Sequence, residues 1–413
     1  MLYHLFNFLE ENYEFTGASL FQFITFRTGI AILISLTISL IFGGRIIKMI
    51  QNFQVIEKQR ALGLPGEQLK GKTPTMGGII IIMAIIIPTL LMADLTNVYI
   101  QMLLLCTIWM GMIGFLDDYL KLKRGKDGLA GRYKILGQVG LGIIVGAVMF
   151  FSDKVTVRMD KDQVEKYNYE VISEVVDAET GVISYNVKTA LTNLPFFKNN
   201  TFDYADLLTF LGEGYAHLAW IIFIPLVVFI VTAVSNAANL TDGLDGLATG
   251  TSAIIVATLG ILTYVSGNSV FSEYLGILYI PDSAELVVFI GCFLGGCLGF
   301  LWYNSFPAKI FMGDTGSLTI GGIIAALAII IRKEWLIPIL CGVFLAENLS
   351  VILQVAYFKY TKKKYGEGKR IFLMSPLHHH YQKKGWHEVT IVTRFWIVGI
   401  ILAVLTIITL KLR

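Results

Sequence analysis

Five aspartates stand where apolar runs of this 413-residue chain end. They are Asp117, Asp118, Asp242, Asp245 and Asp314. Each alone could be a solvated helix end or a helix cap, but their recurrence at one kind of position favours a single shared site. Neighbouring carboxylates repel one another, and a bound divalent cation would relieve that repulsion. Because no cysteine or histidine adjoins them, these hard oxygen ligands predict Mg²⁺ or Mn²⁺ rather than Zn²⁺. Asp314 lies between two glycines, so we expect it to project from a short loop toward a cation or a phosphate. We expect similar acidic loops at Asp117 with Asp118 and at Asp242 with Asp245.

Basic residues lie close to these acids in the sequence. Lys70 and Lys72 precede a segment rich in threonine and glycine, and Lys121, Arg132 and Lys134 follow the first acidic pair. A lysine beside a membrane span is commonly only a topology signal. Interleaved with acids for a cation, however, lysine, threonine and glycine donors supply charge neutralisation and a cradle for phosphate, as phosphoryl transfer requires. The predicted substrate is therefore a phosphate or a diphosphate.

Three consecutive histidines, His378, His379 and His380, stand in the last polar segment. Successive side chains on a helix diverge by about 100°, so three neighbours cannot all face one ion. Contact with phosphate or sugar is therefore predicted rather than metal binding. Glu347, midway along an apolar run, is left outside the predicted site, since a protonated glutamate bonded between helices explains it as well as a functional role does.

The elements that must position these residues are membrane helices. The chain is 55% apolar and 15% charged, with a mean hydropathy of +0.67, which excludes an ordinary soluble protein. The small net charge of +3 does not indicate nucleic acid binding. We expect an all-α integral membrane protein, one polytopic domain of residues 1–413, with ten transmembrane helices long enough to cross a core of about 30 Å. The apolar runs begin near Phe23, Gly77, Val98, Ile135, His217, Leu244, Ala284, Ser317, Trp335 and Val389.

Lysine and arginine are distributed unevenly between alternate loops. One side carries 21 of them and the other carries 10, of which six lie in one long loop that the positive-inside rule discounts. This distribution predicts that both termini face outward and that the acidic residues face inward. The long outer loop, residues 152–203, falls between the fourth and fifth runs, and its alternating pattern predicts an external β-hairpin with a turn at residues 179–181. This insertion carries none of the predicted chemistry.

Five motifs together carry a resemblance to a known family. They are KTPTMGG at residues 72–78, FLDDY at 115–119, NLTDGLDGLA at 239–248, FMGDTGS at 311–317 and PLHHHY at 376–381. Through them, nearly the whole chain resembles the phospho-N-acetylmuramoyl-pentapeptide-transferases, bacterial enzymes that make the first lipid-linked peptidoglycan precursor. The resemblance implies transfer of phospho-MurNAc-pentapeptide from its UDP conjugate to undecaprenyl phosphate, with Mg²⁺ and release of UMP. It also implies a multi-pass protein of the bacterial inner membrane, with the lipid bilayer as a partner, a periplasmic insertion and a cytoplasmic active site; the oligomeric state, with a homodimer as one option, stays open.

The same resemblance implies roles for individual residues. Asp314 corresponds to the Mg²⁺ ligand, and Asp117 and Asp118 correspond to the catalytic acidic pair, with Asp117 as the favoured base for the lipid phosphate. Substrate contacts are implied for Lys70, Thr75, Lys134, Asn239, Asp242, Asp245, Asn304, Phe311, His378, His379 and His380. Direct attack and a covalent enzyme intermediate both remain open. The insertion is longer than the short external hairpin expected of the family.

Two other functions fit part of this pattern. A polyprenyl-phosphate N-acetylglucosamine-1-phosphate transferase shares the acidic motifs, but the run of histidines at residues 378–380 favours the muramoyl enzymes. A cation transporter would need acids near the middle of the membrane, whereas these acids stand at the ends of apolar runs.

Overall fold

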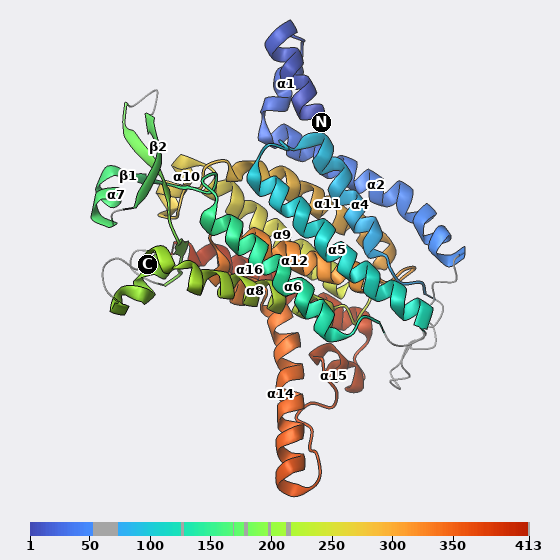
Figure 1. Ribbon diagram of the computed structural model, residues 1–413. Coiled ribbons are helices and arrows are strands. Elements are labelled where there is room, and N and C mark those ends of the chain that lie inside the picture. Colours follow the sequence, from blue (N-terminus) through green and yellow to red (C-terminus); the bar gives the residue numbers. More distant parts are fainter. Residues whose placement is uncertain are drawn as a thin grey trace.

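Long helices make up most of the protein (Figure 1). The structure, a computed structural model, describes residues 1–52, 73–124, 128–167, 169–176, 181–196, 200–211 and 216–411. Its longer helices are α1 (Leu2–Tyr13), α2 (Ile24–Asn52), α4 (Gly78–Met92), α5 (Val98–Arg124), α6 (Gly131–Phe151), α8 (Trp220–Thr241), α9 (Leu247–Ser266), α11 (Leu286–Asn304), α12 (Gly313–Ile330), α14 (Gly342–Tyr365) and α16 (Glu388–Thr409). Short helices are α7 (Lys161–Tyr167), α10 (Ser269–Leu275), α13 (Ile337–Leu340) and α15 (Leu377–Lys383).

Eight helices of the described chain are long and apolar enough to cross a membrane. A ninth span is reached if the segment Glu334–Leu340 and α14, which meet at an angle of 77°, are counted together. Helix α4 is apolar but has only 15 residues, short of the roughly 20 that a bilayer core needs. The protein is thus a mostly helical membrane protein, while the expected number of ten spans and the outward position of both termini stay predictions.

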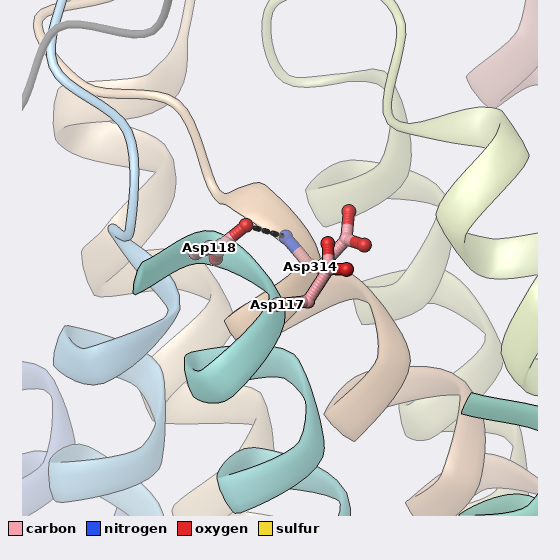
Figure 2. Close-up of side chains that lie close together, drawn as sticks. All are labelled: Asp117, Asp118 and Asp314. Atoms are coloured by element: carbon pink, nitrogen blue, oxygen red, sulfur yellow. Dashed lines mark hydrogen bonds between the residues drawn. The ribbon is translucent and has the colours of Figure 1, made fainter. Parts of the chain in front are cut away.

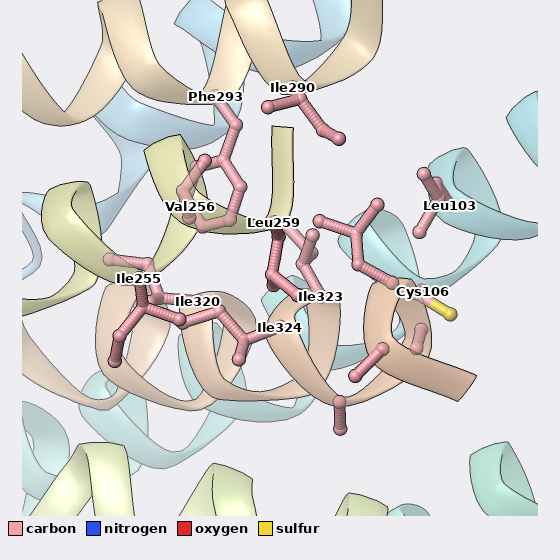
Figure 3. Packing of buried hydrophobic residues seen from close by; sticks show 14 of the residues in the cluster. Leu103, Cys106, Ile255, Val256, Leu259, Ile290, Phe293, Ile320, Ile323 and Ile324 are labelled. Atoms are coloured by element: carbon pink, nitrogen blue, oxygen red, sulfur yellow. The ribbon is translucent and has the colours of Figure 1, made fainter. Parts of the chain in front are cut away.

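Helix α12 is the centre of the bundle. Every residue of α12 after Gly313 is buried, because the helix packs against α4, α5, α8 and α9. Figure 3 shows Ile320, Ile323 and Ile324 of α12 among side chains of α5, α9 and α11. Because α12 is enclosed by other helices along its whole length, its first residues, Gly313 and Asp314, are held in a fixed place.

The loops before α4 and α12 are paired through their backbones. Phe311 donates its N–H to the carbonyl of Pro74 at 2.8 Å, and Gly77 donates to the carbonyl of Phe311 at 2.8 Å. A further bond joins the N–H of Gly78 to the carbonyl of Met312 at 2.9 Å. These bonds bring the threonine-rich segment before α4 next to the N-terminus of α12.

The insertion between α6 and α8 contains strands. Strands β1 (Val157–Asp160), β2 (Glu170–Val176) and β3 (Ile183–Lys188) form an antiparallel sheet in the order β1-β3-β2, and β4 (Leu191–Asn193) pairs with β5 (Thr201–Asp203). The sequence predicted a hairpin here; the described strands form a three-stranded sheet and a separate pair, and most of the expected turn lies outside the described residues. The side of the membrane on which the sheet lies stays a prediction.

Helix α14 projects away from the packed helices (Figure 1). It ends at Gly366, which adopts a left-handed conformation with φ 79°, and the chain then returns along the helix to α15. We call α14 with residues 366–378 the α14 arm. The sequence predicted one continuous ninth span here, so the 77° bend before α14 is a feature that the apolar pattern did not reveal.

Candidate active site

Asp117, Asp118 and Asp314 come together between α5 and α12. Each can offer one carboxylate oxygen to a group in which these atoms all lie within 4.8 Å of one another, and Figure 2 shows the three side chains close together, Asp117 and Asp118 from α5 and Asp314 from the start of α12. The sequence predicted loops at both places, and this was wrong. Asp117 and Asp118 lie within α5, and Asp314 lies in the first turn of α12. Helix α5 can continue past its acids because lysines and the α12 N-terminus balance their charge.

Asp118 caps the N-terminus of α12. Its Oδ1 accepts the N–H of Asp314 at 3.1 Å, and its Oδ2 accepts the N–H of Thr315 at 2.9 Å and the hydroxyl of Thr315 at 2.6 Å. The first N–H groups of a helix have no partner within it, and a carboxylate there also meets the positive end of the helix dipole. Gly313, with φ 70°, passes so close that a Cβ would lie 2.6 Å from Asp118 Oδ2. Asp118 therefore fixes the position of Asp314.

Two lysines bridge the other two carboxylates. Lys134 Nζ on α6 lies 2.6 Å from Asp314 Oδ2 and 3.0 Å from Asp117 Oδ1. Lys121 Nζ, one turn beyond Asp117 on α5, lies 2.8 Å from Asp117 Oδ2 and 3.2 Å from Asp314 Oδ1. Asp117 is completely buried and Asp314 is 8% exposed, so unpaired charges here would be strongly disfavoured. The two ammonium groups supply the balancing charge.

Asp314 is also held from the side by α8. Asn239 donates its side-chain N–H groups to Asp314 Oδ1 and to the hydroxyl oxygen of Ser317, both at 2.8 Å. Ser317 in turn donates to the carbonyl of Gly313 at 3.0 Å. Both oxygens of Asp314 thus have partners from three different helices, which fixes the direction of its carboxylate.

A cavity of about 260 Å³ opens beside these acids. Its lining comprises Thr75, Lys121, Asn239, Asp242, Gly243, Leu244, Asp245, Asn304, Phe311, Gly313 and Asp314. Burial, with Asp314, Asp118 and Asp245 nearby, raises the pKa of Asp242 to about 7. The sequence motifs before α4, after α8 and before α12 therefore contribute to one polar cavity.

Two residues of the lining have structural partners as well. Asn304 accepts the N–H of Gly246 at 3.1 Å and the hydroxyl of Thr249 at 2.9 Å, and donates to the carbonyl of Ile310 at 3.0 Å. Asp245 accepts the N–H of Ala308 at 2.9 Å. Both residues therefore tie the loops around the cavity together.

The three histidines take three different positions. His378 is completely buried and bonds to Glu347, as described below. His379 pairs through Nδ1 with Gln382 Oε1 at 2.7 Å, and His380 accepts the N–H of Leu373 at 3.1 Å. Of the described residues that line the cavity, none is a histidine. Lys70 lies outside the described residues.

Sequence reasoning left two residues of this region out of its predicted site. Lys121 was noted only as a nearby base, although its spacing of four from Asp117 on a helix places both side chains on one face. Glu347 was left out because the sequence carries no signal that joins it to His378, which stands 31 residues further along the chain.

The chemistry of the acid group fits a hard divalent cation. Carboxylate oxygens from separate helices converge, and no thiol or imidazole is among them. Both oxygens of Asp118 accept hydrogen bonds from α12, so Asp117 and Asp314 are the better placed to hold a cation in exchange for the lysine contacts.

Residues 100–332 match the model of the family described as Glycosyl transferase family 4, and the chain is a membrane-embedded member of that class. Over the full length of both chains it is 61% identical to the phospho-N-acetylmuramoyl-pentapeptide-transferase of Flavobacterium psychrophilum. The corresponding enzymes of Flavobacterium johnsoniae and Parabacteroides distasonis are 58% and 55% identical, again over all of each chain. The chain therefore belongs to the phospho-N-acetylmuramoyl-pentapeptide-transferase family, as the resemblance of its motifs predicted.

Proposed function

We propose that this protein transfers phospho-N-acetylmuramoyl-pentapeptide from its UDP conjugate to undecaprenyl phosphate, which yields lipid I and UMP. Family membership over the whole chain supports this reaction. The observation that carries it at the level of residues is the cavity that brings together acids, the lysine Lys121 and the aromatic residue Phe311. A donor with a nucleotide and a diphosphate needs these groups together.

The reaction exchanges one phosphoanhydride bond for another. In the direct route, an oxygen of the lipid phosphate attacks the β-phosphorus of the UDP donor, and the bond from that phosphorus to the bridging oxygen of UMP breaks. We assign Asp117 as the acceptor for a proton that the lipid phosphate carries. Apart from its contact with Lys121 Nζ at 2.8 Å, its Oδ2 has no partner among the described residues, so an oxygen lone pair is available.

The remaining residues bind and orient. Lys121 and Lys134 offer positive charge to the donor phosphates, and Asn239 keeps the Asp314 carboxylate in place. Phe311 lies at the cavity wall, where its ring can stack on uracil. Asp118 acts through the α12 N-terminus and is therefore a positioning residue. We also assign Lys70, Thr75, Asp242, Asp245, Asn304, His378, His379 and His380 to donor binding, directly or through the loops that they hold.

Mg²⁺ is the cofactor that we propose, held by Asp314 with Asp117. When bound, it neutralises the diphosphate and stabilises the leaving UMP. The acceptor keeps its lipid tail in the bilayer while the donor is soluble in water, so a site at the cytoplasmic ends of inner-membrane helices meets both. The positive-inside distribution supports that orientation.

A direct assay tests the function. Purified protein in lipid or detergent is given undecaprenyl phosphate, Mg²⁺ and UDP-MurNAc-pentapeptide, and release of UMP and formation of lipid I are measured. We expect both products, and their loss when EDTA removes divalent cations. A competition with UDP-GlcNAc distinguishes the sister transferases: preferential use of UDP-GlcNAc, or no transfer from either donor, would overturn the proposal.

A further inference from the structure

Three buried polar residues follow one face of α14 at intervals of seven. Glu347, Gln354 and Thr361 are 0%, 8% and 1% exposed, although most residues around them on α14 are exposed or half-buried. Residues seven apart lie two turns apart on the same side of a helix. All three face the segment that returns along the α14 arm, so they form a polar ladder between the helix and that segment.

Each residue of the ladder bonds to the backbone of the returning segment. Thr361 accepts the N–H of Lys369 at 2.8 Å. Gln354 accepts the N–H groups of Ile371 and Phe372 and donates to the carbonyl of Phe372, all at 3.0 Å. Glu347 accepts the N–H of His378, at 3.2 Å for Oε1 and 3.4 Å for Oε2. The ladder thus fixes the segment along its length.

Only Glu347 reaches a side chain of the segment as well. Its Oε2 lies 3.1 Å from Nδ1 of His378, and both side chains are essentially inaccessible to solvent. A carboxylate that accepts a backbone N–H and also faces Nδ1 favours a proton on that nitrogen, since an Nδ1–H donates to it. The ring then presents Nε2 on its opposite side.

Nε2 of His378 faces Gly243, a residue of the cavity lining. It is buried and has no hydrogen-bond partner among the described residues. The neighbour that covers it is Gly243, where a Cβ would come within 2.2 Å of Nε2, and Gly243 belongs to the cavity lining between Asp242 and Leu244. Leaving a buried polar nitrogen without a hydrogen bond destabilises a protein. Because Nε2 points toward the cavity loop, we expect it to find its partner when the substrate is bound.

We propose that Glu347 is a positioning residue for transfer: it holds His378 with the proton on Nδ1, so that Nε2 accepts a hydrogen bond from the bound donor at the Gly243 edge of the cavity. This inference rests on the proposed function and adds to it a residue that acts through His378. This role depends on the charge and the shape of the Glu347 side chain. The backbone contacts that Gln354 and Thr361 also make would not be enough for it.

The first experiment compares variants of the ladder. Glu347→Ala removes the acceptor of Nδ1–H, Glu347→Gln keeps an oxygen there without the charge, and Gln354→Ala is the matched control that loses backbone contacts only. We expect kcat/KM for UDP-MurNAc-pentapeptide to fall about 10- to 100-fold in Glu347→Ala, the range for a lost charged hydrogen bond. Glu347→Gln should fall less, and Gln354→Ala should lose thermal stability with a smaller change in kcat/KM.

The second experiment reads the histidine ring itself. The chain has six histidines, so ¹⁵N-histidine NMR of the purified protein is tractable, and His378→Gln identifies the His378 signals. We expect Nδ1 of His378 to be protonated in wild type and in Gln354→Ala, and this preference to disappear in Glu347→Ala. The measurement needs no turnover.

The outcomes separate this inference from the proposed function. Two results would overturn the role of Glu347 and leave the function intact, provided that the wild type is active. One is a proton on Nε2 rather than Nδ1 of His378. The other is a kcat/KM for Glu347→Ala no lower than that of Gln354→Ala. Wild type without transfer overturns the function, whatever the ring shows. If Glu347→Ala does not fold, Glu347→Gln decides: unchanged kcat/KM and an unchanged ring signal overturn the inference.

Discussion

Buried charge occurs at both ends of α12, but it is balanced in different ways. At the N-terminal end, Asp314 meets Lys121 and Lys134 beside an open cavity. At the other end, Arg332 and Lys333 are 3% and 0% exposed, and their partners are fixed parts of the insertion and of α6. Around Asp314, a ligand that enters the cavity can replace a lysine contact. Around Arg332 and Lys333, the described residues leave no such opening to the cavity.

The contacts of the second group show what it does. Arg332 donates to the carbonyls of Thr189 and Met149 at 3.2 and 3.4 Å, and its own carbonyl accepts the N–H of Asn193 at 3.0 Å. Lys333 donates to the side-chain oxygen of Asn193. Charge at this end therefore anchors the last part of the insertion to α12, which teaches that burial and charge alone do not identify a catalytic site.

Shortening the insertion tests the structural role of Arg332 and Lys333, and we expect it to have the largest effect. The sheet β1-β3-β2 packs on a small cluster that is separate from the main core and contains Val157, Met159 and Val187, with Leu278 as its buried member from outside the insertion. Replacing residues 157–188 by a short linker should therefore leave a folded, active protein. Extending the deletion to residue 203 removes β4 and β5 and, with them, all contacts of Thr189, Thr192 and Asn193 to Arg332 and Lys333, and we expect no folded protein. Size-exclusion profiles and turnover of the two deletions check this.

The sequence alone predicts that residues 152–203 carry none of the chemistry, and it makes no distinction between the two deletions. If the longer deletion folds and turns over like the shorter one, the anchoring role assigned to Arg332 and Lys333 is wrong.

Asp314→Asn tests the other end. A neutral amide cannot balance two lysines or hold a divalent cation, so we expect transfer to fall by about 100-fold or more, the scale seen when a charge-stabilising group is removed from an active site. Turnover with saturating Mg²⁺ is the measurement. Asp153→Asn is the control, since its ion pair with Lys188 lies at the surface and such pairs contribute little. Near-normal turnover of Asp314→Asn would contradict the site.

Asn193→Ala should reduce stability rather than activity, the opposite of Asp314→Asn. It removes the acceptor of Lys333 and a donor to the carbonyl of Asn200, so the free energy of unfolding should fall by about 1 to 3 kcal/mol while folded protein keeps its turnover. Denaturant titration and the UMP assay measure the two quantities. Asn186→Ala, at a less buried position on β3, should cost less; equal losses would argue against the anchor.

The smallest effect concerns pH. Burial lowers the pKa of Lys333 from its usual 10.5 to about 7, with Glu334 opposing that shift. Between pH 7 and pH 10.5, Lys333 is protonated in the unfolded chain but largely neutral in the folded protein. The free energy of unfolding therefore rises with pH in this range. From pH 8 to pH 9 the gain from this group is at most about 1.4 kcal/mol. We expect Lys333→Met to lack this contribution, which the difference between wild-type and variant unfolding curves at the two pH values measures.

The sequence predicted the helices well for a physical reason. Long apolar runs have few alternatives to a membrane helix, and helices begin near all ten expected positions, although only eight or nine qualify as spans in the described chain. The bend before α14 does not show in the apolar pattern, which continues across Cys341, although Pro338 and Gly342 beside it mark a place where a helix can kink.

The site could be predicted only in part. Recurrence of aspartates at span ends indicated one acid group, and Asp117 and Asp314 meet as that hypothesis required. The capping of α12 by Asp118 and the contact of Glu347 with His378 join segments 196 and 31 residues apart. Such pairs follow from how helices pack, which a local pattern does not encode. The roles in catalysis and metal binding stay predictions.

The α14 arm has a geometric consequence for substrate access. Its polar ladder keeps the helix and the returning segment together, so a rotation at the bend near Cys341 would move them as one body. Glu347 stands five residues from the start of α14, about 8 Å along the axis, while Tyr365 stands about 35 Å away at 1.5 Å per residue. A given rotation therefore displaces the tip more than four times as far as His378. The tip is therefore the part of the arm whose position depends most on the 77° angle of the bend, and Glu347 with its partner His378 depends on it least.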